Sequence, residues 1–136
     1  MCVAFVPAAD LKRKFSVLGH FYNVAVETGE RFCCRSVMEI RRRANDSSSN
    51  RDHPDLPDAI VIMMNPGGSK PLDTAPIDVS SAHGPFVNRH LVPTAPDTTQ
   101  YQVMRVMLHL GWAFARVLNL SDLREAKSSK FAKLCP

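Results

Sequence analysis

The sequence lacks the cysteine and histidine spacings of a metal site. Its four cysteines show no Cys-x-x-Cys pattern, and no His-x-x-x-His pair accompanies them. Two of them, Cys33 and Cys34, are adjacent and would point to opposite faces of a strand. We therefore predict reduced thiols in a cytoplasmic protein, with no metal and no other cofactor.

Long apolar runs are also missing. No stretch reaches the ~18 consecutive apolar residues of a membrane span. The short apolar start of the chain precedes Lys12, Arg13 and Lys14, which is the reverse of the order in a signal peptide. The sequence thus predicts a soluble protein that has no membrane partner.

The charge excess is small. Seventeen Lys and Arg against thirteen Asp and Glu give a net charge of +4, which suits an anionic partner but equally an ordinary soluble surface. The length of 136 residues, 45% of them apolar, fits one domain spanning residues 1–136. A doubly wound sheet usually has more strands than this chain offers, so we expect a minimal or truncated version.

The central feature is an apolar run, residues 59–64, that ends in Asn65-Pro66-Gly67-Gly68. Its length and β-branched content predict a fully buried, central parallel strand. Ligands of open α/β sheets bind beyond the carboxyl ends of strands, so the loop from Asn65 to Lys70 is the predicted binding site. A tight turn without a ligand would explain the same four residues equally well.

A helix and a second strand follow. Asp97 and Gln100 resemble a capping box, and apolar residues recur at helical spacing over residues 98–110, before Gly111. Residues 112–120 then predict a second buried strand. A strand, a helix and a strand in succession imply a right-handed crossover and a parallel pair, which would bring Asn65 and Asn119 to one edge of the sheet.

The rest of the chain completes the predicted fold. Residues 15–27 and 32–40 predict an antiparallel hairpin, and residues 44–57 a mobile polar loop. Prolines interrupt residues 66–97, which we interpret as one long loop or lid that carries His83 and His90. The predicted architecture is a small three-layer α/β sandwich with parallel central strands and this amino-terminal hairpin.

The first half of the predicted site is the strand-end loop. Asn65 offers a neutral amide that can position a water molecule or read the edge of a base. Gly67 and Gly68 would let a ligand approach the backbone, and Ser69 and Lys70 continue the binding loop. The order Gly-Gly-Ser-Lys is not that of a phosphate-binding P-loop, which excludes an NTPase of that type.

The second half of the predicted site follows the second strand. Asp122 would act as a general base or orient a substrate hydroxyl, beside Asn119 and Arg124, and Arg124 would hold an anionic group. The alternative is that Ser121 or Asp122 caps a short helix. The sequence contains no Gly-x-Ser-x-Gly nucleophile elbow.

These segments together resemble a bacterial and phage family called domain of unknown function 1643. The resemblance rests on the strand that ends in Met64-Asn65-Pro66, the helix at 98–110, the pair Gly111-Trp112, and Asn119-Leu120 followed by Arg124. It covers most of the chain, including the hairpin. The sequence departs from the family pattern at Gly67, where Ser is frequent, in a long insertion at 69–96, and in ending early.

A shorter stretch is similar to the uracil-DNA glycosylase superfamily, several branches of which end their first parallel strand in Asn-Pro-Gly. The resemblance implies that Asn65 holds the water molecule that attacks the sugar carbon. We therefore predict a protein that binds a nucleotide or a nucleic-acid base, with hydrolysis of an N-glycosidic bond as the candidate reaction. The alternative is a non-enzymatic module of phage or mobile-element origin that binds DNA or a protein.

Overall fold

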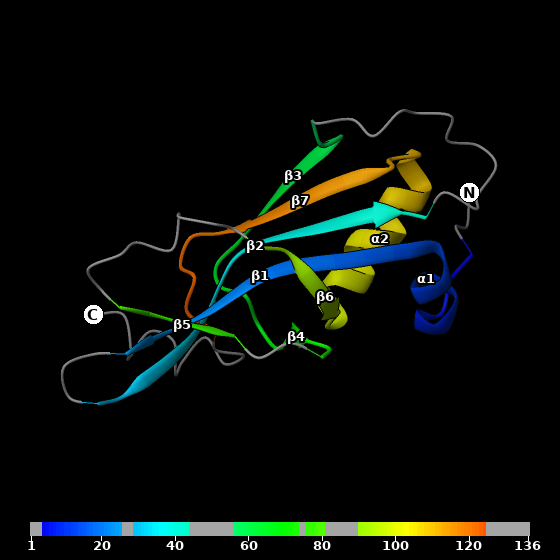
Figure 1. Cartoon of the computed structure of the whole chain (residues 1–136). Helices are drawn as coiled ribbons and strands as arrows, with labels where there is room; N and C mark the ends of the chain where they lie inside the picture. The colour runs from blue at the N-terminus through cyan, green and yellow to red at the C-terminus, as the bar shows by residue number, and fades with distance from the viewer. Residues whose placement is uncertain (1–3, 26–28, 44–55, 74–75, 81–89, 125–136) are drawn as a thin grey trace.

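The structure is a computed structural model that describes residues 4–25, 29–43, 56–73, 76–80 and 90–124. It has an α/β fold with one mixed sheet, in the strand order β3-β7-β2-β1-β6-β4, while β5 pairs with β1 beside this path (Figure 1). The elements are α1 Ala8–Lys14, β1 Phe15–Ala25, β2 Arg31–Arg42, β3 Ala59–Met63, β4 Lys70–Pro71, β5 Ile77–Ser80, β6 Val92–Ala95, α2 Thr98–Leu110 and β7 Phe114–Asn119.

The amino-terminal hairpin is confirmed. Strands β1 and β2 pair antiparallel from Phe15 opposite Arg42 to Ala25 opposite Arg31, with a shift in register between His20 and Phe21. Strand β2 is longer than predicted at both ends, and residues 26–27 of the predicted first strand lie outside the described residues. The hairpin forms the middle of the sheet, because β7 adds to β2 on one side and β6 to β1 on the other.

The parallel unit is also confirmed. Strands β3 and β7 run parallel, from Ala59 opposite Ala115 to Met63 opposite Asn119, and the chain between them forms β4, β5, β6 and then α2. Asp97 caps α2 in a full capping box with Gln100, and Gly111 ends the helix with a left-handed φ of 70°. Both strands therefore end at the same edge of the sheet.

The prediction that β3 is a buried central strand was wrong. Strand β3 is an edge strand whose sheet neighbour is β7, and the side chains of Ile60 and Ile62 are 59% and 66% exposed. The alternating residues Val61 and Met63 pack against the core. A continuous apolar run hides this alternation, because the residues on both faces of the strand are hydrophobic.

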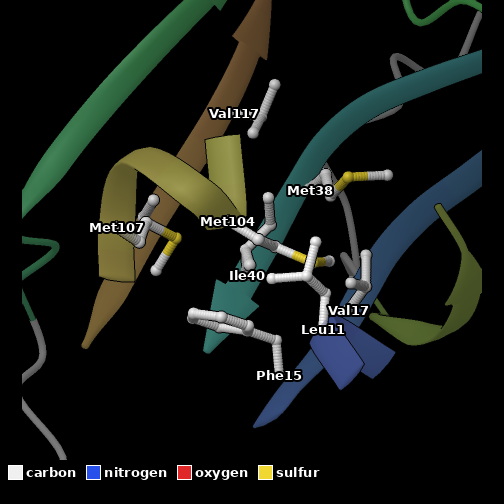
Figure 2. Close-up of a cluster of buried hydrophobic side chains, with 9 residues drawn as sticks. Leu11, Phe15, Val17, Met38, Ile40, Met104, Met107 and Val117 are labelled. Atoms are coloured by element: carbon white, nitrogen blue, oxygen red, sulfur yellow. The ribbon is translucent and has the colours of Figure 1, made fainter. Parts of the chain in front are cut away.

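The core lies between one face of the sheet and the two helices (Figure 2). It is formed by buried side chains from α1, α2 and the three strands β1, β2 and β7: Leu11, Phe15, Val17, Met38, Ile40, Met104, Met107, Ala115 and Val117. A three-layer sandwich needs a helix on the other face, and the described residues form none there. No helix in this part of the chain is long and apolar enough to cross a membrane.

The stretch predicted as one long loop contains three short strands, β4, β5 and β6. Lys70 pairs with Ala95, and Leu18 of β1 pairs with Pro93, so β6 joins β4 to the sheet. Prolines fit here because β4 and β6 are short strands at the margin of the sheet. His90 is exposed just before β6. His83 and residues 44–55 of the predicted polar loop lie outside the described residues.

Candidate functional site

A pocket of about 480 Å³ opens where β3 ends and α2 begins. The turn after β3 forms one wall and the first turn of α2 forms the other. The described residues that line it are Met63, Met64, Asn65, Gly67, Gly68, Asp97, Thr98 and Thr99. The pocket therefore lies at the carboxyl edge of the parallel strands, where the sequence predicts a site.

The turn after β3 is held by the side chain of Asn65. Its Oδ1 accepts a hydrogen bond of 3.0 Å from the backbone N–H of Gly67, and Gly67 has a left-handed φ of 64°. This is the local geometry that Asn and Gly favour in turns. Because Oδ1 is used inside the turn, the Nδ2 group is the part of the Asn65 amide that can donate to a ligand.

Asp97 joins this turn to α2. Its Oδ2 accepts from the N–H of Gly68 at 3.1 Å, and its Oδ1 accepts from the N–H groups of Thr99 and Gln100 at 2.9 and 3.3 Å. The sequence identifies Asp97 as a helix cap but not as a site residue. Its place beside the turn after β3 is a contact between residues far apart in the chain, which no local pattern shows.

Arg35 of β2 lies behind the pocket and is fully buried. One Nη donates to Ser69 Oγ and the other to Asn119 Oδ1 at 3.4 Å, while Asn119 Nδ2 donates to the carbonyl of Arg35 at 3.1 Å. Burial lowers the pKa of Arg35 to about 10, an effect that the carboxylate of Asp97 partly opposes. Arg35 thus ties the loop after β3 to the end of β7, and sequence analysis missed it because a buried arginine in a strand carries no motif.

Asp122 and Arg124 belong to a different cluster. The hydroxyl of Tyr22 donates to Asp122 Oδ2 at 2.6 Å, and Arg124 lies 5.6 Å from the ring centroid of Phe21. Burial is the largest cause that raises the pKa of the Tyr22 hydroxyl, and Asp122 raises it further. Burial also raises the pKa of the neighbouring Cys34 thiol to about 11.

The structure therefore separates the predicted catalytic pair. Asn65, Gly67 and Gly68 line the pocket, whereas Asp122 is not among its described lining residues and binds Tyr22 instead. The cause is the path of the chain after β7. The N–H groups of Leu120 and Ser121 first donate to the carbonyls of Met63 and Met64, and the chain then continues antiparallel along β2, where Leu123 bridges to Cys34.

The remaining predicted ligand residues lie either behind the pocket or outside it. Ser69 is buried and bonds to Arg35, Asn119 reaches the site through the same arginine, and Lys70 is an exposed residue of β4. Asn119 and Ser69 therefore shape the pocket from behind. Arg124 lies over the ring of Phe21 and is not among the described residues that line the pocket.

The described residues contain no group of three or more His, Cys, Asp or Glu side chains that could hold a metal ion. The described lining of the pocket offers an amide, a carboxylate, two hydroxyls and backbone N–H groups. Comparison of the chain with protein-family models, curated proteins and solved structures gave no match, so both resemblances drawn from its sequence stay predictions.

Proposed function

We propose that the strand-end pocket binds a nucleotide or a nucleic-acid base, and that the protein is a glycosylase-like hydrolase of N-glycosidic bonds. One observation carries the proposal: the amide of Asn65 and the carboxylate of Asp97, from distant segments, line the same pocket. Asp97 takes the role of general base that the sequence suggested for Asp122.

The lining of the pocket suits a flat polar ring. Met63 and Met64 supply apolar, polarisable surface against which a base can lie. Thr98 and Thr99 add hydroxyls that can donate or accept. The volume of about 480 Å³ falls within the range of roughly 300–1,000 Å³ that is typical of small-molecule sites.

The proposed reaction uses Asp97 as the general base. Its carboxylate has about four acceptor positions, and three backbone N–H groups occupy three of them. The fourth would accept a proton from a water molecule as its oxygen attacks the anomeric carbon. The bond from that carbon to the base nitrogen breaks, the electron pair leaves with the base, and solvent protonates the base. Asn65 Nδ2 would donate to the base or orient the water.

Two variants test the proposed hydrolase activity. Asp97→Asn keeps a good helix cap while removing the charge, and Asn65→Ala removes the amide donor. Release of bases from oligonucleotides that contain uracil or other modified bases would be measured beside thermal shifts with nucleosides and nucleotides. His109→Ala, at the far end of α2, is the matched control. We expect both site variants to lose base release, roughly a hundredfold or more, while the control keeps it.

Full base release by Asp97→Asn would contradict the mechanism. Absence of any thermal shift with nucleosides and nucleotides, together with no base release by the native protein, would contradict the proposal as a whole. Circular dichroism of each variant shows whether a loss reflects chemistry or unfolding.

The alternative is a non-enzymatic DNA-binding module, and one feature favours it. On the sheet face away from the helices, the guanidinium groups of Arg41 and Arg116 both lie over the ring of Phe114 and share a single carboxylate, that of Glu39. This leaves a positive excess next to an aromatic ring. DNA binding that weakens with salt and survives Asn65→Ala would support this alternative.

The free thiols of Cys33 and Cys34 fit a reducing compartment, so the proposal includes a cytoplasmic location. The proposed kinship with the domain of unknown function 1643 family rests on the end of β3, on α2 with Gly111 and Trp112, and on Asn119, Leu120 and Arg124 at and after the end of β7.

A further inference from the structure

A second cavity, of about 390 Å³, lies between β1, α1 and the connection from β6 to α2. Its inner wall includes the buried side chains of Phe15, Val17 and Met104, which also belong to the core. Figure 2 shows these three side chains between the sheet and the helices. The proposed function does not use this cavity.

The cavity exists because β6 follows β1 for only a short distance. The two strands pair at Leu18 with Pro93 and at Gly19 with Val92, while Phe15–Val17 of β1 extends beyond them. The strands approach closely at Gly19, where a Cβ would lie 2.8 Å from the ring of Phe21 and 2.9 Å from Thr94 Oγ1. The start of β1 thus forms one side of the cavity where a continuing strand would otherwise fill it.

Two cations border this apolar space. Lys12 and Arg43 both line the cavity and are both exposed, which places their charges at its opening. Arg43 Nε donates to the carbonyl of Phe15 at 3.1 Å, so its guanidinium is anchored next to the inner wall. On α1, Arg13 forms an ion pair with Asp10, and no carboxylate is among the described residues that line the cavity.

We propose that this cavity is a binding site for a small amphipathic carboxylate, such as a medium-chain fatty acid. The apolar body would contact Phe15, Val17 and Met104, and the carboxylate would lie between Lys12 and Arg43. Burial of the chain supplies affinity in proportion to its apolar area, and the two cations supply the preference for an anion.

Octanoate is the probe, and octanol is the neutral comparison of the same length. Isothermal titration calorimetry on the full chain should show octanoate binding that weakens as salt rises, and octanol binding at least several times more weakly. Lys12→Gln and Arg43→Gln should each weaken octanoate binding by roughly three- to tenfold, because each removes one exposed charge contact. Arg13→Gln, one residue along the same helix but outside the cavity, is the matched control and should change it less than twofold.

Ala95→Phe tests the location, since Ala95 lines the cavity and a phenyl ring there would fill it. We expect octanoate binding to be lost while the circular dichroism spectrum is kept. Equal binding of octanol and octanoate, equal effects of Arg13→Gln and Lys12→Gln, or octanoate binding that survives Ala95→Phe would each overturn the proposal. Asn65→Ala should leave octanoate binding unchanged, which separates this site from the strand-end pocket.

Discussion

The carboxylate of Asp97 occupies the space in which a side chain on Gly67 would lie. A Cβ at Gly67 would be 2.7 Å from Asp97 Oδ2, whereas a Cβ at the next residue, Gly68, would meet nothing within 4 Å. The turn after β3 and the cap of α2 therefore fit together through the absence of one methyl group.

This contact predicts different outcomes for two neighbouring substitutions. Gly67→Ala combines a left-handed backbone with a clash against Asp97, and we expect it to lower the free energy of unfolding by about 1–3 kcal/mol. Gly68→Ala has neither problem and should change it by less than about 0.5 kcal/mol. Urea unfolding followed by circular dichroism measures both. Equal effects of the two substitutions would show that the turn does not hold this geometry.

The cap of α2 gives a second prediction. Asp97→Ala removes the acceptor for Gly68, Thr99 and Gln100, and should cost about 1–2 kcal/mol of unfolding free energy. Asp97→Asn retains an oxygen acceptor and should cost less than half of that. Thermal and urea unfolding of both variants would test this order. An Asn variant as unstable as the Ala variant would mean that the turn needs both carboxylate oxygens, since Asn has only one oxygen to share between Gly68 and the N–H groups of α2.

The adjacent thiols should differ in reactivity. Cys33 is exposed, whereas Cys34 is buried and burial raises its pKa to about 11. In a background in which Cys2 and Cys135 are Ser, native protein should react with a thiol reagent near neutral pH at Cys33 alone. Cys33→Ser should abolish this fast labelling and Cys34→Ser should not. Fast labelling that persists in Cys33→Ser would contradict the burial of Cys34.

The same thiol makes stability depend on alkaline pH. Because the folded-state pKa of Cys34 is raised from 9.0 to about 11, the fold favours the protonated thiol. This contribution is complete below about pH 9 and is lost as the pH rises from there toward 11. Urea unfolding across this window should show a steeper fall in stability for the native protein than for Cys34→Ala. A fall of the same slope in both would remove Cys34 as its cause.

The edge position of β3 gives the last prediction. Ile62 is largely exposed while Val61 packs against the core. Ile62→Lys should therefore change the unfolding free energy by less than about 0.5 kcal/mol. Val61→Lys would direct a charge toward the core and should cost several times more, roughly 2 kcal/mol or above. The reverse order, measured by urea unfolding, would mean that the strand presents its other face to the helices.

Short sequence patterns predicted the elements that are determined by residues close together in the chain. The box of Asp97 and Gln100 and the left-handed stop at Gly111 define α2, and they are visible as residue types at fixed spacing. The hairpin and the parallel pair followed from apolar runs and the crossover rule. These elements place Asn65 and Asn119 at one edge, as the sequence suggested.

The features that the sequence did not predict depend on contacts between residues that are far apart in the chain. Nothing beside Arg35 in the sequence indicates that its guanidinium will be buried between Ser69 and Asn119. Likewise, the pairing of Leu123 with Cys34 diverts Asp122 from the pocket, and that pairing appears only when β2 and β7 are neighbours. The exposure of Ile60 and Ile62 depends on which strand ends the sheet, which an apolar run does not reveal.

The strand order also determines when each strand can join the sheet as the chain is synthesised. Strands β1 and β2 can pair as soon as the hairpin has left the ribosome, but β3 joins the sheet through β7, which is translated long after it. The edge of the sheet that carries the Asn65 turn is thus complete only once β7 lies between β2 and β3. A nascent chain would acquire its pocket in the final stage of folding, after the hairpin that supports it.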